Sequence, residues 1–597
     1  MEFDATVNFL REWALNTNCT TSALSLSLSG LKKHSCFTNL PSDGRTLLKT
    51  QCSFSSRPVD SGRYVHIGIK TQLTKILGAL ANTLLVNTLD LLINIDGLPL
   101  FKSSPGQIIP ILFSLPRIAS LKGQVFPLGF YYGLQKPKSY TLFLQDFVNE
   151  SIDLINNGFL FNNLNYVVRI IAFVCDAPAK SDLLGIKAHS GYSSCTRCNI
   201  VGITRNHKRV FLETDCAART SKNFINWVDT SYRLHETTLV QIPHLDFVHS
   251  FVLDYMHLVL LGVMRTMIVT WYSGDLPHRL SFVNIKTISD HLRMLSKSTP
   301  CEFVRKPRDL RLVLRWKATE FRMFLLYFGP VVLKDVLDTQ KYNNFITLHV
   351  AISILCNASH CKCLEKRQYA KSLLIHFIST FQILYSQDFI THNFHGLIHL
   401  VDDADYIINK LPYFTLDSIS AFPFENFMQQ IKRMVRAKNF PLEQIINRIS
   451  ERIFYETPIN IIYESDSFKM FTVHQSGPLL PTCSDPQYKK IIFNNFKLST
   501  RPPNNCCGLT NSDIILVRNI VFCTSMNLFV IIGQKYLYKT SFYEIPCQSS
   551  KLDIYRLSKL SHLKIFLIKD ISVKYIVLPY KESVILHFHF YILLDLQ

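Results

Sequence analysis

Two apolar stretches decide the fold: LDLLINIDGL at residues 89–98 and YVVRIIAFVCDAP at residues 166–178. Each is a short run of mainly aliphatic and β-branched residues, which is typical of a strand buried on both faces. The first run ends near Asp96 and the second at Asp176, which precedes Ala177 and Pro178. We therefore expect two buried strands that each present a carboxylate at their last residue.

Two further strands and a helix are expected between these runs. Residues 108–115 and 125–132 are short apolar or aromatic runs separated by turn residues. Residues 142–157 carry apolar side chains at helical spacing, and Gly158 follows as a stop signal. The order strand, strand, strand, helix, strand opens an RNase H-like fold, in which the first and fourth strands carry catalytic acids.

The whole chain is expected to be an α/β protein with an interrupted core. Residues 177 to about 410 are mainly helical in pattern and too long for a loop, which predicts an inserted domain. After residue 480 the pattern changes to short β-branched runs between turns. We expect an N-terminal accessory region at 1–85, an RNase H-like core in two parts at 86–176 and 411–460, a helical insertion with a CxxC at 177–410, and a linker with a small all-β domain at 461–597.

Composition and charge restrict the class of protein. The 597 residues are 48% hydrophobic, and 64 Lys and Arg against 44 Asp and Glu leave a formal charge of +20. So basic a chain usually has a polyanionic partner, which is nucleic acid or an anionic membrane surface. The two most apolar long stretches, 76–95 and 247–271, both contain several polar side chains, so we expect buried core and no membrane span. The 16 cysteines follow no secretory signal, which favours reduced thiols.

Three acids are candidates for a catalytic metal site. Phosphoryl transfer on DNA uses two divalent cations, and Mg²⁺ or Mn²⁺ prefers carboxylate oxygens. Asp96 and Asp176 are the first two candidates, and Glu425 is the third because Pro423 predicts a helix that begins just before it. Two ordinary alternatives remain open at this point. Asp176 is equally compatible with a turn or helix cap, and Glu425 with a solvated helix.

A second group has the spacing of zinc ligands. Cys195 and Cys198 form a CxxC, and His395 and His399 form an HxxxH that places both imidazoles on one face of a helix. Thiolates and imidazoles suit Zn²⁺ rather than Mg²⁺, so this site should be structural. His392 is an alternative to either histidine, and core packing is the alternative to a metal.

Two basic clusters are candidate DNA contacts. Such clusters can follow a phosphate backbone without reading bases, although charge runs are usually just solvated surface. The candidates are Arg305, Lys306, Arg308 and Arg311 in the insertion, and Lys432, Arg433 and Arg436 after the third acid. On the helix expected there, Lys432 and Arg436 share one stripe with Glu425.

Several motifs occur together in an order that resembles a known family. The chain is similar to transposases of the CACTA (En/Spm) superfamily, especially their animal relatives, over roughly residues 85 to 455. The motifs are NIDGLPLF at 94–101, CDAPAK at 175–180, GYSSCTRC at 191–198, DYMH at 254–257, NFHGLIH at 393–399 and AFPFEN at 421–426. Asp254 and His257 belong to one of these motifs, and structural packing is our default interpretation of that pair.

The resemblance implies a DDE-type transposase. Such an enzyme nicks double-stranded DNA at element ends and then joins a 3′-hydroxyl to target DNA. It would use Mg²⁺ or Mn²⁺ on Asp96, Asp176 and Glu425, work in the nucleus and assemble as a homo-oligomer. A similar CxxC and histidine-pair zinc arrangement occurs in the catalytic subunit of the vertebrate antigen-receptor recombinase.

The same resemblance leaves two other functions open. No N-terminal DNA-binding module is recognisable, which favours a truncated chain or a catalytically inactive, domesticated descendant that binds DNA or chromatin. A repair or RNA-directed nuclease on the same fold is the remaining alternative.

Overall fold

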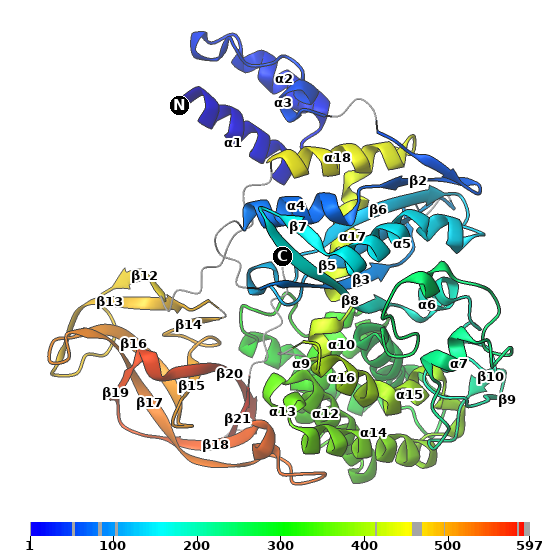
Figure 1. The fold of residues 1–597 in the computed structure, drawn as a ribbon. Coiled ribbons are helices and arrows are strands. Elements are labelled where there is room, and N and C mark those ends of the chain that lie inside the picture. Colours follow the sequence, from blue (N-terminus) through cyan, green and yellow to red (C-terminus); the bar gives the residue numbers. More distant parts are fainter. Residues whose placement is uncertain are drawn as a thin grey trace. The chain divides into compact units, whose positions relative to one another are not determined.

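The computed structural model describes residues 2–50, 54–80, 86–101, 105–411, 415–455, 468–494, 496–581 and 584–589 (Figure 1). Contacts divide the chain into two compact units. The first unit comprises residues 1–189, 219–252 and 421–462, and the second comprises 190–218, 253–420 and 463–597. The chain is mixed α/β with a helical middle region and a C-terminal β domain, as the sequence indicates.

The first unit is built on a nine-stranded sheet in which β1-β2-β6-β5-β3-β8-β11 form a continuous path. The short strands β4 and β7 pair with β5 and β8. The strands are β1 (Arg57–Val59), β2 (Gly62–His66), β3 (Thr88–Ile95), β4 (Leu98–Pro99), β5 (Gln107–Ser114), β6 (Phe126–Gly133), β7 (Phe159–Phe161), β8 (Leu164–Cys175) and β11 (Phe251–Leu253). The four strands expected between residues 89 and 175 form as β3, β5, β6 and β8.

Two helices bury one face of this sheet. Helices α4 (Ile69–Ala79) and α5 (Tyr140–Asn157) pack their apolar stripes into the same core as the alternate β3 residues Leu91 and Ile93. The expected stop signal works because the residue after α5, Gly158, has a φ of 76°, which glycine adopts without a Cβ clash.

The sheet extends beyond the expected core boundaries on both sides. β1 and β2 lie in the expected accessory region but continue the sheet, since β2 pairs with β6 through Tyr64 and Tyr131. β11 lies inside the expected insertion, yet it joins the sheet next to β8. Strands of three to five residues give too little alternation to be detected in a sequence window.

The remaining helices of the first unit lie before, inside and after the sheet residues. Three N-terminal helices share a small leucine-rich core, and α1 contacts α18 (Figure 1). The helices of the first unit other than α4 and α5 are α1 (Glu2–Asn16), α2 (Thr21–Leu31), α3 (Gly44–Leu48), α6 (Ala177–Leu184), α7 (Ser221–Ile225), α17 (Phe422–Met434) and α18 (Pro441–Tyr455).

The middle region of the second unit is helical apart from the hairpin β9 (Ile203–Arg205) and β10 (Lys208–Val210). It includes two π-helical segments, η4 (Met256–Met264) and η7 (Phe324–Phe328). Its other main elements are α8 (Arg265–Ser273), α9 (Phe282–Leu295), α10 (Ala318–Met323), α11 (Gly329–Val332), α12 (Thr339–Cys356), α13 (Ala358–Lys362), α14 (Leu364–Leu384), α15 (His392–Gly396), the 3₁₀ turn η9 (Leu397–His399) and α16 (Leu400–Ile408).

One described helical segment, Met256–Ser273, is long and apolar enough to cross a membrane by length and composition. It overlaps most of the apolar stretch 247–271, which the sequence predicts to be buried core. Its residues are 61% buried inside the protein, where η4 contacts α10 and α15. A single, mostly buried helix of this kind is weak evidence for a membrane span.

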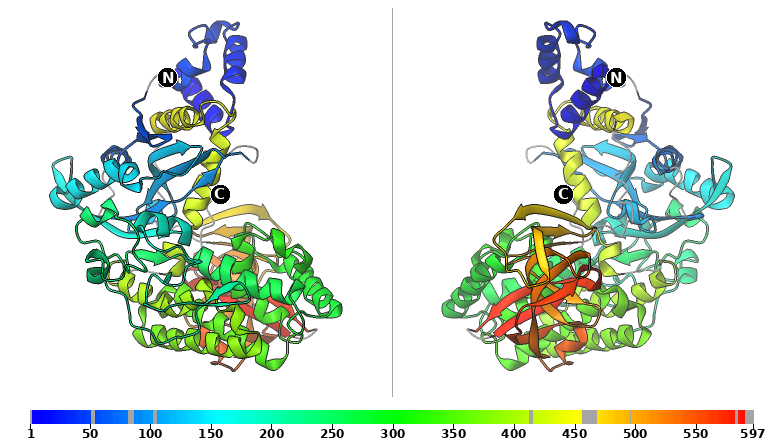
Figure 2. Two further views of the ribbon diagram at one scale, coloured as in Figure 1. Left: turned by 90° about the vertical axis from the view of Figure 1, so that its right-hand side faces the viewer. Right: turned by 90° about the vertical axis from the view of Figure 1, so that its left-hand side faces the viewer.

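The C-terminal β domain, in orange and red in Figure 2, contains strands that pair with one another. Six of them pair in a closed ring. The ring runs β16-β15-β20-β21-β18-β17 and closes through the pairing of β17 with β16. Apolar side chains from five of these strands pack together, among them Cys506, Leu516 and Tyr575. The strands are β12 (Lys469–His474), β13 (Cys483–Ile492), β14 (Lys497–Ser499), β15 (Cys506–Leu509), β16 (Ile514–Cys523), β17 (Leu528–Ser541), β18 (Tyr555–Leu560), β19 (Lys564–Leu567), β20 (Ile571–Tyr580) and β21 (Val584–His589).

A buried ion-pair group holds the central strand β3. The Asp90 side chain is fully buried, and its two oxygens lie 2.6 Å from Arg117 Nε and 2.8 Å from Arg169 Nη2. A carboxylate without water needs such partners, because its burial alone costs several kcal/mol. Asp90 is therefore a structural acid, occupied by two guanidinium groups.

Replacing this buried carboxylate should destabilise the first unit. We expect Asp90→Asn to lower the free energy of unfolding by about 3 kcal/mol, because two arginines lose their shared counter-charge. The matched control is Asp153→Asn, which removes an exposed pair with Lys70 and should change the stability far less than Asp90→Asn. Urea unfolding of both variants measures the difference, and equal midpoints would contradict the structural role of Asp90.

Candidate metal centre and acidic pocket

The two aspartates that end the decisive strands lie at matching positions of neighbouring parallel strands. β3 and β8 run parallel and pair Leu92 with Ala172 and Ile93 with Phe173. The same offset, continued to the strand ends, sets Asp96 opposite Asp176. The carboxyl ends of parallel strands meet at one edge of a sheet, where neighbouring strands are about 4.8 Å apart. Both aspartates are half-buried there.

Each aspartate is oriented by one local hydrogen bond. Gly97 N donates to Asp96 Oδ1 and Ala179 N donates to Asp176 Oδ1, each at 2.7 Å. Asp176 is thus the N-cap of α6, as the ordinary interpretation of its sequence predicts. A carboxylate has about four lone-pair positions, so this cap does not exclude a second ligand.

Both aspartates line one pocket with a volume of about 130 Å³. Its wall also contains Lys136, Tyr140 and Asp182. The residues that form it come from β3 and the turn after it, from β5, from α6 and its N-cap, and from the start of α5 and the segment before it. The pocket is therefore polar, acidic and built entirely from the first unit.

The pocket residues influence the titration of their neighbours. Burial raises the pKa of the Cys175 thiol to about 12, and the adjacent carboxylate of Asp96 adds to this rise. Burial likewise raises the pKa of Tyr140, and the charges of Asp182 and Asp96 raise it further. Both groups are consequently protonated at neutral pH and add no negative charge to the pocket.

Glu425 lies in the first turn of α17, as expected, but outside the lining of this pocket. The helix is tied to the residues after β3, since Lys432 Nζ donates to Pro99 O at 3.0 Å. In the part of the chain that the structure describes, Asp96, Asp176 and Glu425 do not form a group whose ligand oxygens all lie within 4.8 Å of one another. The structure therefore brings two of the three candidate acids to one pocket.

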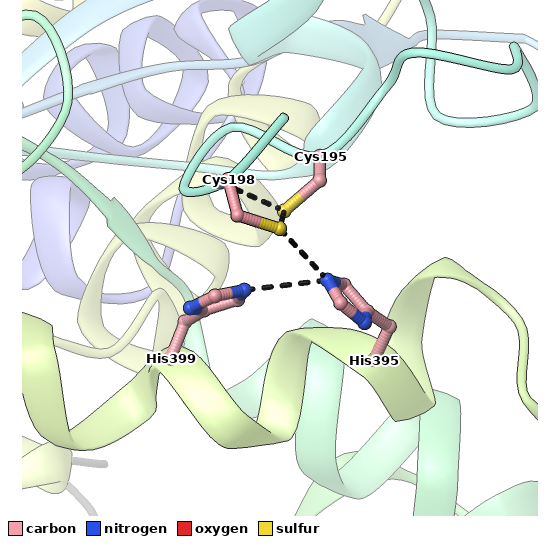
Figure 3. A group of neighbouring side chains, drawn as sticks. All are labelled: Cys195, Cys198, His395 and His399. Atoms are coloured by element: carbon pink, nitrogen blue, oxygen red, sulfur yellow. Dashed lines mark hydrogen bonds between the residues drawn. The ribbon is translucent and has the colours of Figure 1, made fainter. Parts of the chain in front are cut away.

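The four candidate zinc ligands form a compact, buried group in the second unit (Figure 3). Cys198 Sγ lies 3.5 Å from Cys195 Sγ and 3.2 Å from His395 Nε2, and His395 Nε2 lies 3.3 Å from His399 Nε2. Four tetrahedral ligands at zinc bond lengths of about 2.3 Å to sulfur and 2.0 Å to nitrogen are separated by roughly 3.3–3.8 Å. The donor set and its spacing fit a tetrahedral Zn²⁺ ion.

Local backbone structure sets up each half of this group. Cys195 Sγ accepts hydrogen bonds from the backbone N–H groups of Arg197 and Cys198, each at 3.4 Å, which folds the CxxC into a tight turn. The two histidines lie one turn apart on the continuous helical run of α15 and η9. His392 is not one of the four residues of the group, and its Nε2 lies 3.3 Å from Ser194 O.

The protonation of the group supports metal binding. Burial alone would raise the pKa of Cys195, but Cys198, His395 and His399 surround its sulfur and hold the pKa well below that of a free thiol. Burial lowers the pKa of His399, whereas Asp402 and Cys195 raise it, and the outcome is a pKa of about 9. The neighbouring Cys195 and burial raise the pKa of Cys198, which therefore stays protonated at neutral pH. A cation that binds all four residues would displace two protons, one from Cys198 and one from His399.

A buried arginine ties the two halves together. Arg197, between the two cysteines, makes two hydrogen bonds of 2.7 and 2.8 Å to Asp403, four residues after His399. Asp403 also accepts a hydrogen bond from Leu253 N at 2.7 Å, so its carboxylate bonds both a side chain and the backbone. This pair fixes the CxxC turn against α16. The sequence analysis did not identify it, because no spacing rule connects an arginine and an aspartate 206 positions apart.

A second carboxylate faces the back of His399. Asp402 Oδ2 lies 3.5 Å from His399 Nδ1, and Lys371 Nζ lies 2.5 Å from Asp402 Oδ1. Metal-binding histidines commonly direct their other nitrogen at a carboxylate, which fixes the ring and increases its basicity.

The candidate DNA contacts differ in their availability. Arg308 and Arg311 are engaged by Glu320 and Asp309, whereas Arg305 and Lys306 are exposed. Lys432 and Arg433 lie exposed on the last turns of α17. Arg436 corrects one expectation: α17 ends at Met434, because Val435 is extended, so Arg436 is not on the helical stripe of Glu425. Its guanidinium donates instead to Cys19 O at 2.8 Å.

The motif pair Asp254 and His257 forms a local structural contact. Asp254 Oδ2 lies 2.6 Å from His257 Nδ1 and accepts from the His257 N–H at 2.9 Å. The carboxylate is buried and caps the start of η4. These contacts agree with structural packing as the default interpretation.

Comparison with known protein families gives a match in the C-terminal part of the chain. Residues 473–593 match the model of a domain of unknown function, DUF8592. This match covers most of the C-terminal β domain and none of the pocket or the Cys/His group. No curated protein matches the chain.

Removing the two thiols should remove the metal. We expect purified protein to carry about one zinc per chain and the double variant Cys195→Ser, Cys198→Ser to carry almost none, because hydroxyl groups are poor zinc ligands. Mass spectrometric metal analysis measures the content. The control replaces two exposed cysteines, Cys36→Ser and Cys301→Ser, and should retain the zinc. Full occupancy in the first variant would exclude these ligands.

The carboxylate behind His399 should tune the affinity. We expect Asp402→Asn to weaken zinc binding by roughly 10-fold or more, because the neutral amide supports the imidazole less well. Competition with a coloured chelator measures the affinity. Asp405→Asn on the same helix removes an ion pair with Arg367 and is the control. An affinity equal to that of the control would show that Asp402 acts only on the fold.

Proposed function

We propose that the chain is a DDE-type DNA strand transferase or a direct descendant of one, with an RNase H-like core in its first unit. The observation that carries the proposal is the pair Asp96 and Asp176, which directly follow the adjacent parallel strands β3 and β8 and line one pocket. The element order β3, β5, β6, α5, β8 agrees with the opening of an RNase H-like fold. The motifs that resemble CACTA transposases contain these same aspartates.

Asp96 and Asp176 would hold Mg²⁺ or Mn²⁺, with Glu425 as the third acid. These cations supply the positive charge that activates an attacking oxygen and stabilises a leaving oxygen. The two aspartates fit this role because both are half-buried and each accepts a hydrogen bond from a backbone N–H group. Asp90 on the same strand does not fit, since two guanidinium groups occupy it.

The other parts of the chain have supporting roles in this proposal. The formal charge of +20 favours double-stranded DNA as the partner, and Lys432 and Arg433 on α17 extend a cationic surface from the helix of Glu425. The Cys/His group, holding zinc, would stabilise the fold of the second unit. A nuclear location and a homo-oligomer follow from the family resemblance.

Cleavage of DNA tests the proposal directly. We expect wild-type protein with Mn²⁺ or Mg²⁺ to nick supercoiled plasmid DNA, and Asp96→Asn and Asp176→Asn each to lose roughly 100-fold or more of the rate, because an amide binds a hard cation poorly. Asp153→Asn is the control for a carboxylate outside the pocket. Equal nicking by the wild type and Asp176→Asn would remove these acids from the reaction. DNA binding without any nicking would identify a non-catalytic descendant.

A further inference from the structure

The pocket beside Asp96 and Asp176 contains a hydrogen-bonded group that the acidic triad does not use. Lys136 Nζ lies 2.7 Å from Asp182 Oδ2, and the Tyr140 hydroxyl donates to the same oxygen at 3.2 Å. All three residues line the pocket with the two aspartates. One carboxylate oxygen thus anchors two donors from the segment that leads into α5.

Lys136 is the only basic residue among those that line the pocket. Three carboxylates line the same walls, so a phosphate would meet a negative field wherever a cation is lacking. An ammonium group has three donors, and the described contacts of Lys136 use one of them on Asp182. The remaining donors are available to an anionic oxygen in the pocket.

The arrangement is not explained by stability alone. The side chains of Lys136 and Asp182 are 49% and 34% exposed, and an ion pair so exposed contributes little to folding. The constraint on its geometry comes from Asp182 on α6, whose N-cap is Asp176, and from Tyr140 at the start of α5. The bond to Asp182 thereby ties Lys136 to the same short helix that Asp176 caps.

We propose that Lys136 binds the phosphodiester group on which the aspartates act, and that Asp182 and Tyr140 position it. This inference rests on the proposed function. It assigns Lys136 to a non-bridging phosphate oxygen, where a charge-assisted hydrogen bond gives both orientation and charge compensation. Asp182 is a positioning residue, because it acts through Lys136.

Lysine footprinting tests the contact without requiring cleavage. The full-length protein is treated with an acetylating reagent in the presence or absence of duplex DNA and Mn²⁺, and mass spectrometry measures the modification rate of each lysine. We expect DNA with Mn²⁺ to slow the acetylation of Lys136 at least about 5-fold, while Lys138 changes little. Lys138 is an exposed lysine two positions away that does not line the pocket. Equal acetylation of Lys136 with and without DNA would overturn the inference.

Nicking kinetics give the second measurement. We expect Lys136→Ala to lower the nicking rate at saturating DNA by roughly 10- to 100-fold with unchanged Mn²⁺ affinity, Lys136→Arg to retain most of the rate, and Lys138→Ala to match the wild type. Asp182→Asn should lower the rate less than Lys136→Ala, since the ammonium group remains. A Lys136→Ala rate equal to that of Lys138→Ala would refute the contact while leaving the aspartates in place.

The two proposals fail in different ways. Asp176→Asn can lose Mn²⁺ binding and nicking while Lys136→Ala behaves like the wild type. That result refutes only the proposal for Lys136. If the wild type neither binds Mn²⁺ nor nicks DNA, the catalytic proposal fails. The footprint then decides by itself whether Lys136 contacts a phosphate.

Discussion

The parallel pairing of β3 with β8 is the constraint on which the candidate active site depends. Residues 79 positions apart pair along the first part of β3, and residues 80 positions apart pair after a register shift between Leu91 and Leu92. Each strand is directly followed by an aspartate. The bond from Asn94 Nδ2 to Val174 O, at 2.7 Å, fixes this register two residues before the aspartates. A parallel pair needs a crossover connection, and here α5 provides it while covering the same sheet. Register, crossover and core packing all lead to the same relative position of Asp96 and Asp176.

In the second unit a different constraint joins distant residues. The CxxC and the HxxxH are 197 positions apart, measured from Cys198 to His395, and closing so long a segment has an entropic cost. The buried pair of Arg197 with Asp403 compensates part of it through protein contacts alone. This pair therefore helps to bring the ligand residues together through protein contacts, in contrast to a small zinc finger, whose folding depends on the ion.

The sequence predicted those features that repeat over many residues or obey a short spacing rule. The strands β3, β5, β6 and β8 were detectable because each is a long apolar run, and the Cys/His group because its two halves have ligand spacing. Features that depend on tertiary contact were not detectable. Asp182 and Lys136 resemble ordinary surface charges in the sequence, and only their shared pocket distinguishes them. The same holds for Arg436, whose expected helical position was lost because α17 ends two residues earlier.

Under the proposed function, the charge of the protein and the charge of the pocket act in opposite directions. The formal charge of +20 attracts a duplex over distances of about a Debye length, roughly 8 Å at physiological ionic strength. The pocket itself carries three carboxylates and one ammonium group, so it repels a phosphate until cations balance Asp96 and Asp176. Binding of cations and binding of the phosphate must then favour each other by an equal free energy, because such coupling is reciprocal. Lys136 adds one positive charge and so reduces the need for bound cations. It cannot replace them, because its ammonium group already pairs with Asp182.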